Sequence, residues 1–178
     1  MRGRPVFYLD TSALVKQYIP EAGSLWVRHI VEAARIATAE FSIVEFAAAL
    51  ARRTRMGELD SQLREDLLEA FLQDVEGYWI VQATRSTVLL AVDLTRSHPL
   101  RAYDALQLAT ALEVADIVGA EGLSLTFVSA DARLCAAAAR EGLATVNPKE
   151  MTNGQMTNDQ MTNDQMTNDQ MTNDRMPF

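Results

Sequence analysis

Residues 6–10 have the sequence Val-Phe-Tyr-Leu-Asp, and the fold class is predicted from this stretch and others like it. Four consecutive apolar residues that end in an acid predict a short strand buried on both faces. Similar short runs occur at 79–83, 125–129 and 144–146, with a further candidate strand at 35–38. Longer stretches of helical character separate these runs. Strands that alternate with helices predict an α/β fold of three layers, in which helices cover both faces of a mostly parallel sheet.

Helices are expected where apolar positions recur every three or four residues. Local signals mark some of their ends: Asp60 is a suitable N-cap, and Pro99 comes just after another helix has ended. The expected helices cover residues 12–18, 23–34, 41–55, 60–76, 86–97, 103–118 and 131–141.

The last part of the chain is a short repeat. From Met151 onward, Met-Thr-Asn-(Gly or Asp)-(Gln or Arg) occurs five times and is followed by Met-Pro-Phe. A period of five matches neither a helix nor a strand, and a single Met per repeat cannot bury enough surface to offset the entropy of ordering. The sequence therefore predicts one folded domain at 1–148 and a disordered repeat tail at 149–178.

The composition is that of an ordinary globular protein, with 48% apolar and 22% charged residues. No apolar run approaches the roughly 20 residues that span a bilayer, and the N-terminus does not resemble a signal peptide. Cys135 is the only cysteine, which excludes a disulfide framework and a cysteine zinc site and fits a cytoplasmic protein. His29 and His98 have no Ser or Cys motif nearby, so we expect no nucleophilic triad.

Four acids stand out from the pattern around them. Asp10 and Asp131 each follow a predicted strand, at the edge of the sheet where functional groups gather in parallel α/β folds. Glu45 is the only charged residue in 41–51, and Asp104 begins the apolar stripe of its helix. Simpler roles remain open at this point: helix capping for the two strand-end acids, a dipole interaction for Asp104, and plain exposure for Glu45.

Convergence of these acids would require a cation, because like charges brought together repel one another. Mg²⁺ binds about six oxygen atoms and keeps several waters, so a carboxylate site without His or Cys suits it, and Mn²⁺ is a possible substitute. Such an ion activates water and stabilises charge during attack on a phosphate. Hydrolysis of phosphodiester bonds is therefore the expected chemistry.

Four motifs carry a more specific indication. They are Phe7-Tyr-Leu-Asp-Thr-Ser-Ala-Leu14, Ser42-Ile-Val-Glu-Phe46, Tyr103-Asp-Ala-Leu-Gln-Leu-Ala109 and Phe127-Val-Ser-Ala-Asp131. In this order and spacing they resemble the PIN-domain nucleases, and among these the VapC-type toxins of bacterial toxin–antitoxin pairs. The resemblance extends over about residues 5–148.

The resemblance implies a PIN-like fold and an Mg²⁺-dependent endoribonuclease that cuts single-stranded RNA regions. It also implies homodimers and a small antitoxin protein that blocks the site. The absence of a long apolar run predicts no association with a membrane. The catalytic and metal-binding residues that it implies are Asp10, Glu45, Asp104 and Asp131, with supporting hydroxyls at Ser12 and Ser129.

The charge of the chain makes RNA binding depend on local patches. The net charge is −8, and the first 150 residues contain 15 Lys and Arg against 20 Asp and Glu. A net acidic domain does not favour RNA binding in general. Arg52, Arg53 and Arg55 form the one compact basic cluster, with a looser pair at Arg96 and Arg101.

Other functions remain as alternatives. A catalytically silent PIN domain would act as a protein- or RNA-binding module, and a PIN nuclease of RNA maturation would use the same acids on another RNA. A haloacid-dehalogenase-like phosphatase needs a second Asp two residues after the first, where this chain has Ser12. A receiver-like domain would place its acceptor Asp in the middle of the chain and not on the first strand.

Overall fold

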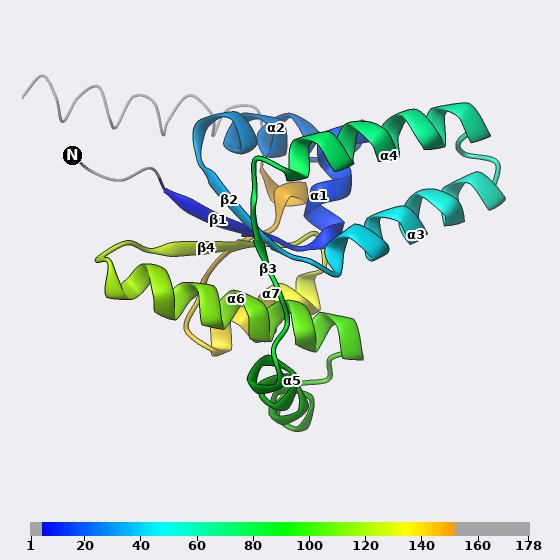
Figure 1. The fold of residues 1–178 in the computed structure, drawn as a ribbon. Helices are drawn as coiled ribbons and strands as arrows, with labels where there is room; N and C mark the ends of the chain where they lie inside the picture. Colours follow the sequence, from blue (N-terminus) through cyan, green and yellow to red (C-terminus); the bar gives the residue numbers. More distant parts are fainter. Residues whose placement is uncertain (1–4, 152–178) are drawn as a thin grey trace, which may run out of the picture.

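The computed structural model describes residues 5–151, which form a five-stranded parallel sheet covered on both faces (Figure 1). The strand order is β3-β2-β1-β4-β5, so the first strand lies in the centre. The strands are β1 (Val6–Leu9), β2 (Arg35–Ala39), β3 (Trp79–Val81), β4 (Leu125–Val128) and β5 (Ala144–Val146). The predicted three-layer α/β/α fold with a parallel sheet is confirmed.

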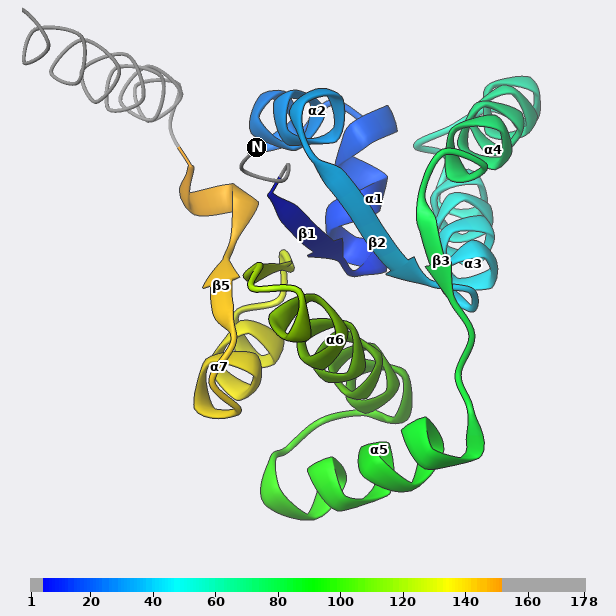
Figure 2. The ribbon, with the colours of Figure 1, turned by 60° about the vertical axis from the view of Figure 1, so that its left-hand side comes forward.

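Within residues 5–151, seven α-helices make up the two outer layers. One face of the sheet is covered by α1 (Thr11–Tyr18), α2 (Ser24–Ala33), α3 (Ser42–Arg55) and α4 (Ser61–Val75). The other face is covered by α5 (Arg85–Ser97), α6 (Ala102–Ala120) and α7 (Ala132–Arg140). Figure 2 shows α3 and α4 as a pair on one side of the sheet and α6 with α5 on the other.

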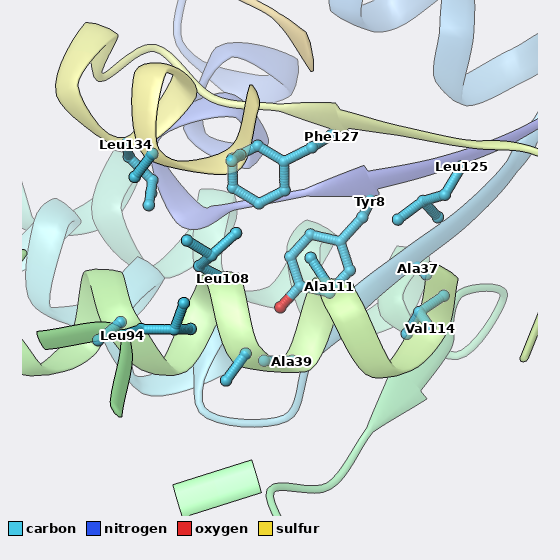
Figure 3. Packing of buried hydrophobic residues seen from close by; sticks show 14 of the residues in the cluster. Tyr8, Ala37, Ala39, Leu94, Leu108, Ala111, Val114, Leu125, Phe127 and Leu134 are labelled. Atoms are coloured by element: carbon cyan, nitrogen blue, oxygen red, sulfur yellow. The ribbon is translucent and has the colours of Figure 1, made fainter. Parts of the chain in front are cut away.

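The central strand supplies both cores because successive side chains of a strand point to opposite faces. Tyr8 is fully buried on the α6 side, where its ring stacks on Phe127 with the ring centroids 5.7 Å apart (Figure 3). Leu9 joins the opposite cluster, under α1 and α3. The α6 face that meets Tyr8 includes Ala111, whose small side chain lets the helix approach the sheet closely.

The register of β1 and β4 places the cleft residues. Leu9 is paired with Val128, so the two strands end at the same level. Asp10 and Ser129 therefore leave the sheet side by side, and the backbone N–H of Asp10 donates to the carbonyl of Val128 at 3.1 Å. This is the edge at which the sequence predicted a site.

The folded part of the chain extends slightly further than predicted. Residues 148–150 form a short 3₁₀ helix, η1 (Pro148–Glu150), and Met151 packs against the core on the α1 side. Residues 149–151 therefore belong to the domain, because η1 lies against Gly23 and Met151 buries apolar surface. The rest of the predicted tail lies outside the described residues. Within 5–151, no helix combines the length and apolar character needed to cross a bilayer.

Candidate active site

A cleft of about 580 Å³ opens at the carboxyl ends of β1 and β4. It brings together side chains from the two strand ends, from α3 on one face of the sheet and from α6 on the other. Its lining includes all four predicted acids, Asp10, Glu45, Asp104 and Asp131, together with Ser12.

Asp10 is the most deeply placed of these acids, with 6% of its surface exposed. Its Oδ1 accepts from the backbone N–H of Ala13 at 3.0 Å, so it caps α1 as the simpler interpretation required. The same carboxylate accepts from Ser12 Oγ at 2.8 Å and from Ser129 Oγ at 3.0 Å. Burial raises the pKa of Asp10 to about 7, against the lowering effect of these hydrogen bonds. Asp10 therefore both caps α1 and lines the cleft.

Ser12 and Ser129 lie where the sequence predicted supporting hydroxyls. Their Oγ atoms are 3.4 Å apart and both contact Asp10. Ser12 Oγ also accepts from the backbone N–H of Ala130 at 2.8 Å, and Ser129 Oγ accepts from that of Asp131 at 3.1 Å. The two hydroxyls thus join Asp10 to the loop that leads into α7.

Glu45 is half-buried in the first turn of α3. Val44, which is 65% exposed, lies opposite the buried face of α3. Glu45 lies at the border of the buried stripe and faces α1 and α6. Ala48 and Ala49, the small residues beside it, line the cleft and leave it open.

Asp104 and Asp131 lie on the cleft at the beginnings of α6 and α7. Asp104 is half-buried, and its Oδ2 accepts from the backbone N–H of Arg101 at 3.3 Å. Asp131 caps α7 by accepting from the backbone N–H of Arg133 at 2.8 Å and of Leu134 at 3.3 Å. Burial opposes ionisation of Asp131, but these hydrogen bonds and the Arg133 side chain hold its pKa below the ordinary value.

Two polar residues that sequence reasoning overlooked belong to the same site. Gln107 on α6 and Thr11 on α1 are both buried, and both donate to Glu45 Oε2. Gln107 could have been found, because it is one turn beyond Asp104 and is the only side chain with an amide in the apolar stretch 105–109. Thr11 gave no comparable signal, since a Thr in the first turn of a helix is common.

The members of each predicted basic cluster lie in different places in the structure. Arg53 is engaged in ion pairs with Glu21 at 3.1 Å and Glu58 at 3.3 Å. Arg52 lines the cleft, as does Arg101. Arg55 is exposed but lies on neither the cleft nor the groove next to it. Only part of each predicted basic cluster therefore faces the acids.

The donor set is one that suits a hard divalent cation. The acids and hydroxyls offer oxygen atoms alone, and within residues 5–151 only Asp131 among the four has a basic side-chain partner. No three acidic, His or Cys side chains of the described chain stand close enough together to enclose a metal ion by themselves. A cation that keeps several of its waters, as Mg²⁺ does, fits such a partly open arrangement.

Comparison with known proteins gives a consistent result. The PIN-domain family model matches residues 7–140. Ribonuclease VapC49 of Mycobacterium tuberculosis is 35% identical over 121 residues, which are 63% of this chain and 78% of that protein. FitAcB from Neisseria gonorrhoeae has a TM-score of 0.59 at 18% identity, over 82% of this chain and 99% of that one. A toxin–antitoxin complex from Klebsiella pneumoniae has a TM-score of 0.51 at 16% identity, over 81% and 98%.

Proposed function

The chain belongs to the PIN-domain family, among the VapC-type ribonucleases, and on this premise we propose that it is the metal-dependent endoribonuclease toxin of a toxin–antitoxin pair. The observation that carries the proposal is the convergence of Asp10, Glu45, Asp104 and Asp131, from four separate elements, on one cleft. Helix capping explains Asp10 and Asp131 as single residues, and the capping box of α6 explains Asp104. It does not explain why all four lie together, or why Asp10 is buried without a basic partner within the described chain.

The four acids would hold one or two Mg²⁺ or Mn²⁺ ions, partly through water. When bound, the metal would lower the pKa of a water molecule and stabilise charge at the phosphorus. The chain's own contribution is positioning. Ser12 and Ser129 hold the carboxylate of Asp10, and the first turn of α6 places Asp104 on the same cleft. Glu45, from the opposite layer, would complete the set of ligands or orient the attacking water.

A groove next to the cleft supports RNA as the substrate of this net acidic protein. It has a volume of about 830 Å³ and shares Ser12, Arg52 and Asp131 with the cleft. Arg133 and Lys149 also line it, and Lys149 donates to the carbonyl of Ala130 at 2.9 Å. Arg52 forms no ion pair within residues 5–151. These cations would bind phosphates of single-stranded RNA beside the one that is cut.

A protein partner that blocks the cleft is part of the proposal. The related fold from Klebsiella pneumoniae is that of a toxin–antitoxin complex. On the rim of the cleft, Val44 is 65% and Tyr103 is 51% exposed, which offers an antitoxin apolar contact area beside the acids. Homodimers are also proposed, and the exposed Val88, Leu89 and Val92 on α5 offer a second apolar surface.

Cleavage of labelled RNA by the purified, antitoxin-free protein tests the function. We expect cutting with Mg²⁺ or Mn²⁺, none with EDTA, and none by Asp10→Asn. The matched control is Asp60→Asn, because Asp60 caps α4 through the N–H of Leu63 at 2.8 Å but does not line the cleft. If the well-folded parent cut none of several RNAs with either metal, the proposed nuclease function would be wrong, and a binding module would be the better interpretation.

A further inference from the structure

Gln107 lines the inner part of the cleft, at the centre of a hydrogen-bond network that joins both helical layers. Its side chain is 2% exposed. Its Nε2 is 2.7 Å from Glu45 Oε2, 2.9 Å from Ser42 Oγ and 3.2 Å from Thr11 Oγ1. One amide of α6 thus contacts the first turns of α1 and α3, on the far side of the sheet edge.

Tyr8 determines which way this amide faces. Its hydroxyl donates to Gln107 Oε1 at 2.7 Å, from a fully buried position on β1. Tyr8 is the donor in this hydrogen bond, because an amide oxygen can only accept. Because the amide oxygen is occupied by this donor, the amide nitrogen must point toward Glu45.

The carboxylate of Glu45 receives both of its hydrogen bonds on the same oxygen. Thr11 Oγ1 and Gln107 Nε2 each donate to Oε2 at 2.7 Å. Thr11 also accepts from Gln107, so the two donors are linked to each other. No residue of the described chain donates to Oε1, and Glu45 lines the cleft. One oxygen is therefore fixed to the protein while the other is left for a ligand.

We propose that Gln107 and Thr11 are positioning residues, which hold Glu45 by Oε2 so that Oε1 faces the metal ion and the attacking water. The inference rests on the proposed function and deepens it. Neutral donors are needed here, because an acid at 107 would repel Glu45. An apolar residue at 107 would leave the Tyr8 hydroxyl without its partner and remove one of the two donors to Glu45. Neither donor has to touch the RNA, since both act through Glu45.

A purely structural role for this network makes a different prediction. Loss of a buried hydrogen bond lowers the stability of the fold wherever it occurs. Thr87 offers the matched case: it is fully buried, and its Oγ1 donates to Glu113 at 2.8 Å, but it does not line the cleft. Thr11→Val and Thr87→Val therefore remove the same group from the same kind of partner, and only one of them touches Glu45.

The test compares Gln107→Leu, Thr11→Val, Thr11→Ser and Thr87→Val with the parent chain. We expect kcat for RNA with saturating Mg²⁺ to fall roughly 10- to 100-fold in Gln107→Leu and Thr11→Val, with KM for RNA unchanged. Thr11→Ser, which keeps the hydroxyl, should restore the parent value. Thr87→Val should keep the parent kcat despite a lower urea midpoint. Binding of Mn²⁺ alone, followed by electron paramagnetic resonance, should weaken in the first two variants only.

Two results would overturn the inference. One is a folded Gln107→Leu with the kcat and the Mn²⁺ affinity of the parent, and the other is an equal loss in Thr87→Val. Failure of the proposed function would look different, because the parent itself would then cut no RNA. In that case the Mn²⁺ titrations still decide about Gln107, and a parent that binds no Mn²⁺ would remove the basis of both proposals.

Discussion

Asp10 is at once the N-cap of α1 and the most buried acid of the cleft. Burial raises its pKa from the ordinary 3.8 to about 7 in the folded chain. The folded state then keeps a proton that the unfolded state releases, so stability falls as the pH rises from about 4 to about 7, and changes no further above it. In EDTA, Asp10→Asn should escape this loss, because Asn is neutral and still caps the helix. Urea unfolding should show the variant more stable than the parent at pH 8, by up to about 4 kcal/mol, and no more stable at pH 4.

Addition of Mg²⁺ gives the complementary measurement at this residue. A cation that binds the folded state alone stabilises it by mass action. At pH 8, Mg²⁺ should therefore raise the stability of the parent and leave Asp10→Asn nearly unchanged. The difference in stability between Asp10→Asn and the parent should depend on pH. If it were the same at pH 4 and pH 8, burial of the ionised Asp10 carboxylate could not be its cause.

Asp104 should separate activity from stability most cleanly. It is half-buried and accepts a single backbone N–H, from Arg101 at 3.3 Å. Asp104→Asn keeps an acceptor for that N–H, so the free energy of unfolding should change by less than about 1 kcal/mol. Loss of a metal ligand should lower kcat on the order of 100-fold or more. Equal kcat in the variant and the parent, measured on the same RNA, would remove Asp104 from the catalytic set.

At the scale of elements, local signals accounted for most of what the structure shows. The apolar runs located the strands to within two residues, and Asp60 marked the cap of α4. The four acids were found because each stands out from its own neighbours. The contacts of Gln107 were not foreseen, since they join α6 to α1 and α3 and depend on how the layers meet. The end of the domain was placed too early, because the repeat begins at Met151 while that residue still packs on the core.

The contact between α2 and η1 can be tested at a glycine. Gly23 has φ +88°, and a Cβ there would lie 2.2 Å from the carbonyl oxygen of Pro148. Gly23→Ala should therefore lower stability by roughly 1–3 kcal/mol, through backbone strain and displacement of η1 together. Gly57→Ala is the control: its φ is +76°, and no atom lies within 4 Å of the added Cβ. Thermal unfolding should show a smaller loss of stability for Gly57→Ala than for Gly23→Ala. Equal losses of stability would mean that η1 can move away from residue 23 without cost.

At the scale of the whole molecule, binding of RNA by a chain of net charge −8 must depend on where its cations lie. Arg52→Gln and Lys149→Gln should raise KM for RNA and leave kcat unchanged, because both residues line the groove and neither is one of the acids. Each lost phosphate contact should also reduce the dependence of log KM on log salt by roughly 0.7. Arg85→Gln, on exposed α5, serves as the control. Unchanged salt dependence in the groove variants would place the RNA elsewhere.

The strand order has a consequence for synthesis of the chain. β4 comes late in the sequence but lies beside β1 in the centre of the sheet, and the last acid, Asp131, follows it. When Asp10, Glu45 and Asp104 of a nascent chain have left the ribosome, β4 is still missing from its place beside β1 in the sheet. The cleft cannot close around its acids before the last quarter of the domain has emerged. The proposed nuclease site is therefore incomplete for most of the synthesis of residues 5–151.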